Sequence, residues 1–167
     1  MTSGADSFAL NAQIQQALAR RDPGAALRVL AEAEAAQPQD AELKLQKAMA
    51  LRLSGDLTGA VNALDQALAL EPYNFVALLS KASLIERMDG EKAATPIYKN
   101  ALTIAPETPP PALAAPIAHA REVVARTADA LEAYLEARVG ATDAALDTAT
   151  RARFAESLKI FTGKARN

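Results

Sequence analysis

The sequence predicts an all-α protein in which three helix pairs stack into a solenoid and a C-terminal helical cap follows them. First, small residues and prolines recur at the same positions in three units of equal length, at residues 7–40, 41–74 and 75–108. Second, hydrophobic residues make up 50% of the chain but aromatic residues only 4%, so alanine, a strong helix former, supplies much of the apolar surface. Third, no stretch alternates β-branched and polar residues as a strand would.

The middle unit shows the repeat most clearly. It holds two helical patterns separated by Ser54-Gly55-Asp56 and ended by Pro72. A shift of one unit in either direction superimposes the same small residues and the same proline without a gap. The matching sets are Ala26, Ala60 and Ala94; Ala33, Ala67 and Ala101; and Pro38, Pro72 and Pro106. The chain is therefore a repeat array.

This pattern resembles the tetratricopeptide repeat, which has small residues at positions 8, 20 and 27 of each unit and proline at position 32. Position 8 is Ile14, Ala48 and Ala82, and position 24 is Leu30, Leu64 and Tyr98. Two positions depart from the family pattern, with Leu10, Lys44 and Leu78 at position 4 and Gln13, Lys47 and Lys81 at position 7. The first unit also has Arg21 where the family has a glycine. The resemblance implies stacked antiparallel helix pairs with a concave groove.

In the first unit, residues 1–6 are expected to be disordered and a helix to span residues 8–20, with Ser7 as its N-cap. Asp22-Pro23-Gly24 predicts the turn into a second helix. That helix should end before Pro38, which cannot donate to the helical ladder.

The second and third units predict two further helix pairs. Their first helices are expected at residues 41–53 and 75–88, and their second helices at residues 57–70 and, after a turn at Asp89-Gly90, up to about residue 104. The last of these carries Pro96, which is tolerated best near a helix start. The sequence therefore predicts that this helix begins late or is distorted at Pro96.

A proline-rich linker at residues 109–115 is expected to separate the repeats from a C-terminal region at residues 116–162. That region opens with an amphipathic helix from Pro116 to about residue 139, and after Gly140 a last segment at residues 142–161 completes the cap. Residues 163–167 form a tail. The apolar stripe of the long helix consists of Ile117, Ala120, Val123, Val124, Ala128, Leu131, Tyr134 and Leu135.

Composition excludes several classes of function. The chain of 167 residues has no cysteine, so it has neither a disulfide framework nor a thiolate site. It contains no run of 18 apolar residues, and its N-terminus lacks the features of a signal peptide, so a soluble, cytoplasmic protein without membrane contact is expected. The net charge of −2 predicts nothing about nucleic acid, but the absence of interleaved aromatic residues argues against nucleic-acid binding despite the basic residues near the C-terminus.

No catalytic constellation appears in the sequence. His119 is the single histidine, and it alone supplies neither a catalytic pair nor a metal site. It is expected to face solvent or to cap a helix, although Glu122 lies nearby on the same helix. Glu32 and Glu34 are interpreted as solvated. We therefore expect no enzymatic activity, cofactor or metal in this chain.

The expected functional surface is the concave groove, to which the repeat resemblance assigns the residues at positions 2, 5, 9, 12 and 13 of each first helix. These are Phe8, Asn11, Gln15, Leu18 and Ala19; Glu42, Leu45, Met49, Arg52 and Leu53; and Val76, Leu79, Ser83, Glu86 and Arg87. Mixed apolar and charged side chains favour a peptide or protein partner. The alternative is that residues 142–161 fill the groove.

The resemblance also rules out one known recognition mode. The clamp that holds a C-terminal carboxylate in chaperone-binding relatives needs cations, whereas its positions here are Asn11, Gln15, Gln46, Val76 and Ser80. Outside the groove, Lys47 and Lys81 share one repeat position and are expected either to extend along the helix interface or to pair with acids such as Asp65.

Residues 41–167 also resemble the N-terminal helical region of bacterial aspartyl/asparaginyl β-hydroxylase family proteins. The resemblance rests on residues 75–105 and on the stretch from the prolines to the C-terminus. In that family a repeat array, a proline break and a long helix precede an iron and 2-oxoglutarate-dependent oxygenase domain. It implies a non-catalytic accessory domain that presents a substrate, with any catalytic domain beyond Asn167. A third hypothesis is self-association into a homo-oligomer through uncovered helix faces.

Overall fold

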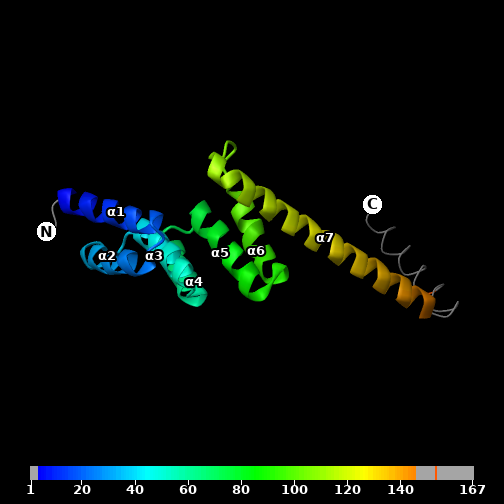
Figure 1. Cartoon of the computed structure of the whole chain (residues 1–167). Coiled ribbons are helices and arrows are strands. Elements are labelled where there is room, and N and C mark those ends of the chain that lie inside the picture. The colour runs from blue at the N-terminus through cyan, green and yellow to red at the C-terminus, as the bar shows by residue number, and fades with distance from the viewer. Residues whose placement is uncertain (1–3, 146–152, 154–167) are drawn as a thin grey trace. The chain divides into compact units, whose positions relative to one another are not determined.

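A computed structural model of the chain describes residues 4–145 and residue 153, and within these residues every regular element is a helix. The helices are α1 (Gly4–Ala19), α2 (Pro23–Ala36), α3 (Ala41–Ser54), α4 (Leu57–Leu70), α5 (Phe75–Asp89), α6 (Glu91–Thr103) and α7 (Pro111–Ala145) (Figure 1). The chain divides into two compact units, Met1–Val124 and Ala125–Asn167.

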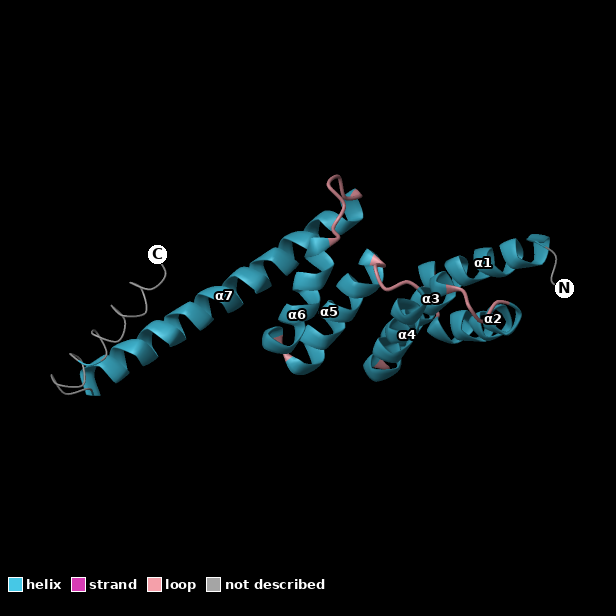
Figure 2. Cartoon of the chain, turned by 180° about the vertical axis from the view of Figure 1, so that it is seen from behind, coloured by secondary structure: helices cyan, strands magenta, loops and turns pink. Residues whose placement is uncertain are grey.

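The first unit contains the three predicted helix pairs, α1 with α2, α3 with α4, and α5 with α6. Successive pairs also contact each other, through α2 with α3 and α4 with α5. The loops within and between the pairs are short, and the longest described connection leads from α6 into α7 (Figure 2). Short connections force neighbouring helices to run antiparallel, as the repeat pattern predicts.

Short acidic and amide side chains start four of these helices. Asp22 accepts the Ala25 N–H at 2.9 Å, and Asp56, one repeat later, accepts the Gly59 N–H at 2.8 Å. Asp40 and Asn74 share another repeat position and cap α3 and α5 in the same way. These caps satisfy N–H groups that have no intrahelical partner, and each stabilises its helix by about 1 kcal/mol.

The turn between the helices of a pair uses a left-handed residue. Gly55 has φ of 90°, and its N–H donates to the carbonyl oxygens of the last turn of α3. Arg21 stands at the same repeat position in the first pair and keeps a positive φ of 56° without being glycine. The first repeat therefore keeps the turn although its sequence departs from the family pattern, at a backbone cost of about 1–2 kcal/mol.

The core consists of small residues at the helix crossings and of larger apolar side chains beside them. Ala26, Ala60 and Ala94 are fully buried, as are Ala67 and Ala101. Alanine leaves room for only a methyl group, so the two helices of a pair approach closely. Beside these contacts, one position of the repeat carries a larger buried side chain, which is Leu30, Leu64 and Tyr98 in the three repeats. Burying such a side chain stabilises the fold by roughly 1.5–3 kcal/mol.

One predicted helix start is wrong, and a late start is excluded for another helix. Helix α1 begins at Gly4, so residues 4–6 are helical rather than disordered and Ser7 lies inside the helix instead of capping it. Helix α6 begins at Glu91 and contains Pro96 as its sixth residue, so it does not begin late. Proline removes one backbone hydrogen bond there. The buried neighbours of Pro96, among them Tyr98, supply the packing that keeps the helix intact.

The predicted linker is partly wrong as well. Helix α7 begins at Pro111, a residue that suits a first helical position because its missing N–H would have no partner. Pro116 therefore lies inside the helix, and α7 continues through Gly140, where a break was expected, to Ala145. The rest of the predicted cap segment, residues 146–152 and 154–161, and the predicted tail lie outside the described residues.

Only the first part of the apolar stripe of α7 is buried. Ile117, Ala120 and Val123 pack in one cluster with side chains of α5 and α6. These turns of α7 therefore cover the apolar face of the last helix pair, as a solenoid requires. Further along, Leu131, Tyr134 and Leu135 each expose more than half of their surface.

Candidate functional site

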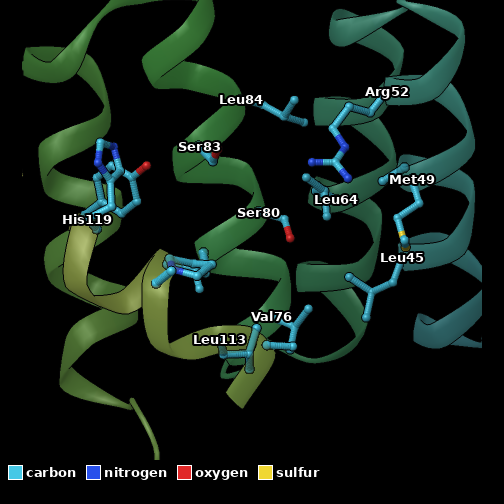
Figure 3. Close-up of a pocket in the computed structure, with 16 residues that line it drawn as sticks. Leu45, Met49, Arg52, Leu64, Val76, Ser80, Ser83, Leu84, Leu113 and His119 are labelled. Carbon is cyan, nitrogen blue, oxygen red and sulfur yellow. The ribbon is translucent and has the colours of Figure 1, made fainter. Parts of the chain in front are cut away.

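A cavity of about 700 Å³ lies between α3, α5 and the start of α7, within the unit Met1–Val124 (Figure 3). Most of its lining is apolar. The lining residues are Leu45, Ala48, Met49, Arg52, Leu64, Val76, Leu79, Ser80, Ser83, Leu84, Tyr98, Ala112, Leu113, Ala115, Pro116 and His119. Cavities of 300–1,000 Å³ with apolar walls and a few polar groups are typical of ligand sites.

Helices α3 and α5 each contribute one wall of the cavity, because the lining residues of each helix lie on one of its faces. Leu45, Met49 and Arg52 are four and three residues apart on α3, which places them on one face of that helix. On α5 the matching face carries Val76, Ser80 and Ser83. Two of the apolar side chains are unusually accessible, since Met49 exposes 47% of its surface and Val76 exposes 43%.

The start of α7 forms the third wall. Leu113, Pro116 and His119 line the cavity from this helix. Ala112 lines it as well, and its carbonyl oxygen lacks the regular helical donor because residue 116 is proline. This wall exists because α7 begins at Pro111, so a linker at residues 109–115 would have left the cavity open.

The structure divides the predicted groove residues among several places. Six of them line the cavity: Leu45, Met49, Arg52, Val76, Leu79 and Ser83. Three others, Phe8, Asn11 and Glu42, line a second cavity of about 220 Å³ between α1, α2 and α3. Gln15, Ala19 and Arg87 are exposed and line neither cavity. Leu18 is buried in the core of the first pair, and Leu53 packs against that core.

Sequence reasoning missed ten residues of the cavity. Five come from the repeats, namely Ala48, Leu64, Ser80, Leu84 and Tyr98, and five from α7, namely Ala112, Leu113, Ala115, Pro116 and His119. Ala48, Leu64 and Tyr98 were recognised as repeat positions but were not assigned to the groove. Residues of α7 were missed because the helix was expected to begin at Pro116. Pro111 is equally suitable for a first helical position and was the signal for the earlier start.

A hydrogen-bonded cluster joins α5, α6 and α7 at the edge of the cavity. The Tyr98 hydroxyl donates to Oε2 of Glu86 at 2.6 Å, and Nε2 of His119 lies 2.8 Å from the same oxygen. The rings of Tyr98 and His119 meet edge to face, with centroids 6.1 Å apart. His119 thus pairs with Glu86 of another helix, and Glu86 faces this cluster.

The buried position of Tyr98 changes its acidity. Burial raises the pKa of the Tyr98 hydroxyl well above its ordinary value, and the hydrogen bond to Glu86 and the negative charge of Glu86 raise it further. A hydrogen bond with Ser83 acts in the opposite direction but is outweighed. The hydroxyl therefore stays protonated and holds α6 to α5.

An ion-paired cluster replaces the predicted solvated face at Glu34. Its carboxylate contacts Nζ of Lys44 and of Lys47, each at 2.7 Å, and its side chain is only 14% exposed. Burial alone would raise the pKa of Glu34, but the hydrogen bonds and charges of the two lysines outweigh it and lower that pKa. Lys81 pairs with Asp65, so both lysines of that repeat position join neighbouring helices through acids.

The second cavity contains a polar contact that closes part of it. Gln46 is buried, and its Nε2 donates to Oδ1 of Asn11 at 3.0 Å and to Oε1 of Glu42 at 3.2 Å. Two of the positions that correspond to the carboxylate clamp, Asn11 and Gln46, are therefore bonded to each other.

The described residues contain no group of three or more histidine, cysteine, aspartate or glutamate side chains placed to hold a metal ion. Among the helices of residues 4–145, none combines the length and the apolar character that a membrane span requires. Neither finding extends to the rest of the chain.

Comparison with solved structures identifies the fold. The yeast Sti1 TPR2B domain in its pHsp70 complex matches with a TM-score of 0.63 at 17% identity, covering 72% of this chain and 97% of that one. The first TPR domain of Spaghetti (RPAP3) bound to the HSP90 peptide SRMEEVD matches with a TM-score of 0.64 at 14% identity, covering 76% and 99%. The fold is a tetratricopeptide-repeat solenoid.

The tetratricopeptide fold also matches the type III secretion translocator chaperone SycD of Yersinia enterocolitica, with a TM-score of 0.68 at 10% identity over 79% of this chain and 90% of that one. No known family model matches the sequence, and no curated protein is significantly similar to it. The resemblance to the hydroxylase region has no support from these comparisons and stays a prediction.

Proposed function

We propose that this tetratricopeptide solenoid is a protein-interaction module that holds a segment of a partner protein in the cavity between α3, α5 and α7. The observation that carries this proposal is the accessibility of apolar side chains in a walled cavity of about 700 Å³. Exposed apolar surface inside a concavity is typical of binding sites, since a protein gains stability by burying it. The module acts by binding rather than by catalysis.

Two of the structural neighbours support the same class of function. The Sti1 and Spaghetti domains are described in complex with pHsp70 and with an HSP90 peptide, so this architecture accommodates peptides. In this chain the start of α7 forms one wall of the cavity. Helical or extended peptides with apolar anchors suit such a surface.

The experiment is a selection of random dodecapeptides displayed on phage against the whole chain, followed by affinity measurement on the synthetic peptides. Met49→Asp should weaken binding of the selected peptides at least tenfold, because it places a charge on an apolar wall. Met88→Asp is the matched control, because Met88 is similarly exposed at 40% but lines neither cavity. The control should bind with unchanged affinity.

Two outcomes contradict the proposal. One is a selection that yields no peptide with measurable affinity. The other is a set of peptides that bind Met49→Asp and wild type equally. Circular dichroism of both variants shows whether the fold is retained, which is expected because neither side chain belongs to the buried core.

Self-association is a second candidate, favoured by the exposed side chains of Leu131, Tyr134 and Leu135 on α7. Their spacing of three and four residues forms one apolar stripe, which a second copy of the chain can cover. Sedimentation velocity over a hundredfold concentration range tests it. A dimer that Leu135→Asp dissociates supports this candidate, and a monomer at every concentration rules it out.

A further inference from the structure

Arg52 is the one lining residue of the cavity with a fixed charge. Its side chain extends from α3 into the space between α3 and α5 (Figure 3). Arg52 forms no ion pair with any residue of the described part of the chain. Glu86, an acid on α5, is engaged by Tyr98 and His119 instead. The cavity therefore presents an uncompensated guanidinium beside apolar walls.

The surroundings of Arg52 define the complementary chemistry. A guanidinium binds a carboxylate through two parallel hydrogen bonds, and this pairing strengthens where apolar side chains exclude water. Leu45, Met49 and Val76 require an aliphatic side chain on the same occupant. Ser80 adds one neutral polar contact on the facing helix.

We infer that the occupant is an internal segment of a partner protein that carries an aspartate or glutamate side chain within a few residues of an aliphatic anchor. The carboxylate pairs with Arg52 while the anchor fills the space between Met49 and Val76. This inference rests on the proposed function, because it assigns the chemistry of the ligand in the same cavity.

The structure favours a side-chain carboxylate over a free C-terminus. Proteins that capture a terminal carboxylate surround it with several backbone N–H groups or cations. Here the lining residues Met49, Arg52 and Ser83 lie inside helices, where the backbone N–H groups are already bonded. One guanidinium therefore serves one carboxylate, which a flexible side chain can bring to it.

The test uses the selected dodecapeptides, resynthesised with an acetylated N-terminus and an amidated C-terminus and measured by fluorescence polarisation. The enriched sequences should share an acidic residue within three positions of leucine, isoleucine, valine or methionine. Arg52→Glu should weaken their binding at least tenfold, and exchanging the peptide's acid for lysine should restore the affinity of this variant to within about threefold of wild type. The matched control Arg87→Glu, an exposed charge reversal on α5 away from the cavity, should leave the affinity unchanged.

A second arm does not depend on how the variants fold. Replacing the acid of the peptide by glutamine should produce the same tenfold loss with the unaltered protein. Raising the salt concentration should weaken wild-type binding more than binding of the glutamine peptide.

The outcomes separate the inference from the proposed function. Peptides that Met49→Asp weakens but Arg52→Glu and the glutamine exchange do not would overturn the inference and leave the proposed function intact. Each peptide is also measured with a free C-terminal carboxylate, and peptides that bind in this form but not when amidated would overturn the internal-segment assignment. A selection without any binding peptide would overturn both.

Discussion

The hydroxyl of Tyr98 offers a stringent test of how α6 is held to α5 in the third helix pair. Tyr98 is 1% exposed, and its hydroxyl donates to the Glu86 carboxylate at 2.6 Å, while the same carboxylate also pairs with His119. Tyr98→Phe keeps the ring in the core and removes only the hydroxyl. A hydrogen bond to a charged group contributes about 1.5–3 kcal/mol, so the free energy of unfolding should fall by that amount at pH 8.

The stability that the Tyr98 hydroxyl contributes should decrease at high pH. Because burial and Glu86 raise the pKa of folded Tyr98, its contribution to stability is fully present below the unfolded pKa of about 10 and is lost as the pH rises above it. The stability difference between wild type and Tyr98→Phe should thus be constant from pH 7 to 9. It should shrink above pH 10.

The assay is urea unfolding followed by circular dichroism, with Tyr73→Phe as the control. Tyr73 is 83% exposed, so removing its hydroxyl should change the free energy of unfolding by less than about 0.5 kcal/mol. Equal stability of the Tyr98 and Tyr73 variants at pH 8 would refute the reasoning. A difference that grows above pH 10 would refute its electrostatic part.

Two further predictions concern the remaining cluster and the turn. Glu34→Gln should lower the free energy of unfolding by about 1–2 kcal/mol near pH 7, because Lys44 and Lys47 lose their carboxylate, whereas Glu32→Gln on the exposed face should have little effect. Since the pKa of Glu34 is lowered in the folded state, this contribution is present above the ordinary glutamate pKa of about 4.3 and is lost as the pH falls below it. Urea unfolding of wild type and Glu34→Gln between pH 3 and 7 measures it. A stability difference between the two proteins that persists at pH 3 would contradict the assignment to the Glu34 charge. Gly55→Ala should destabilise the protein by about 1–2 kcal/mol because φ is 90° at this position. Gly24→Ala is the control and should not destabilise it, because Gly24 has a helical backbone and a Cβ there would make only an ordinary contact. Equal thermal melts of the two variants would show that a side chain does not strain the turn at Gly55.

The repeat architecture could be predicted from the sequence because each unit punctuates the chain in the same way. Alanine at the crossings, proline after the second helix and short capping residues recur at fixed spacing, and each has one dominant structural meaning. The turn at Arg21 shows that the other positions of a repeat can impose a backbone conformation that its own side chain disfavours.

The start of α7 could not be predicted as securely, because several prolines compete for the first helical position. Pro111 and Pro116 both fit, and the choice depends on the packing of Ile117, Ala120 and Val123 against the third pair, which local sequence does not encode. The error carried into the site, since α7 supplies a whole wall of the cavity. Long-range pairs such as Glu86 with His119 likewise depend on how the helices stack.

Methyl NMR of the whole chain with a selected peptide tests the central claim most directly. Binding in the cavity predicts chemical-shift changes and peptide contacts at the methyl groups of Met49, Val76 and Leu113, and none at Val29 or Leu30 in the first pair. Contacts confined to other methyl groups, with Met49, Val76 and Leu113 unmoved, would contradict the account.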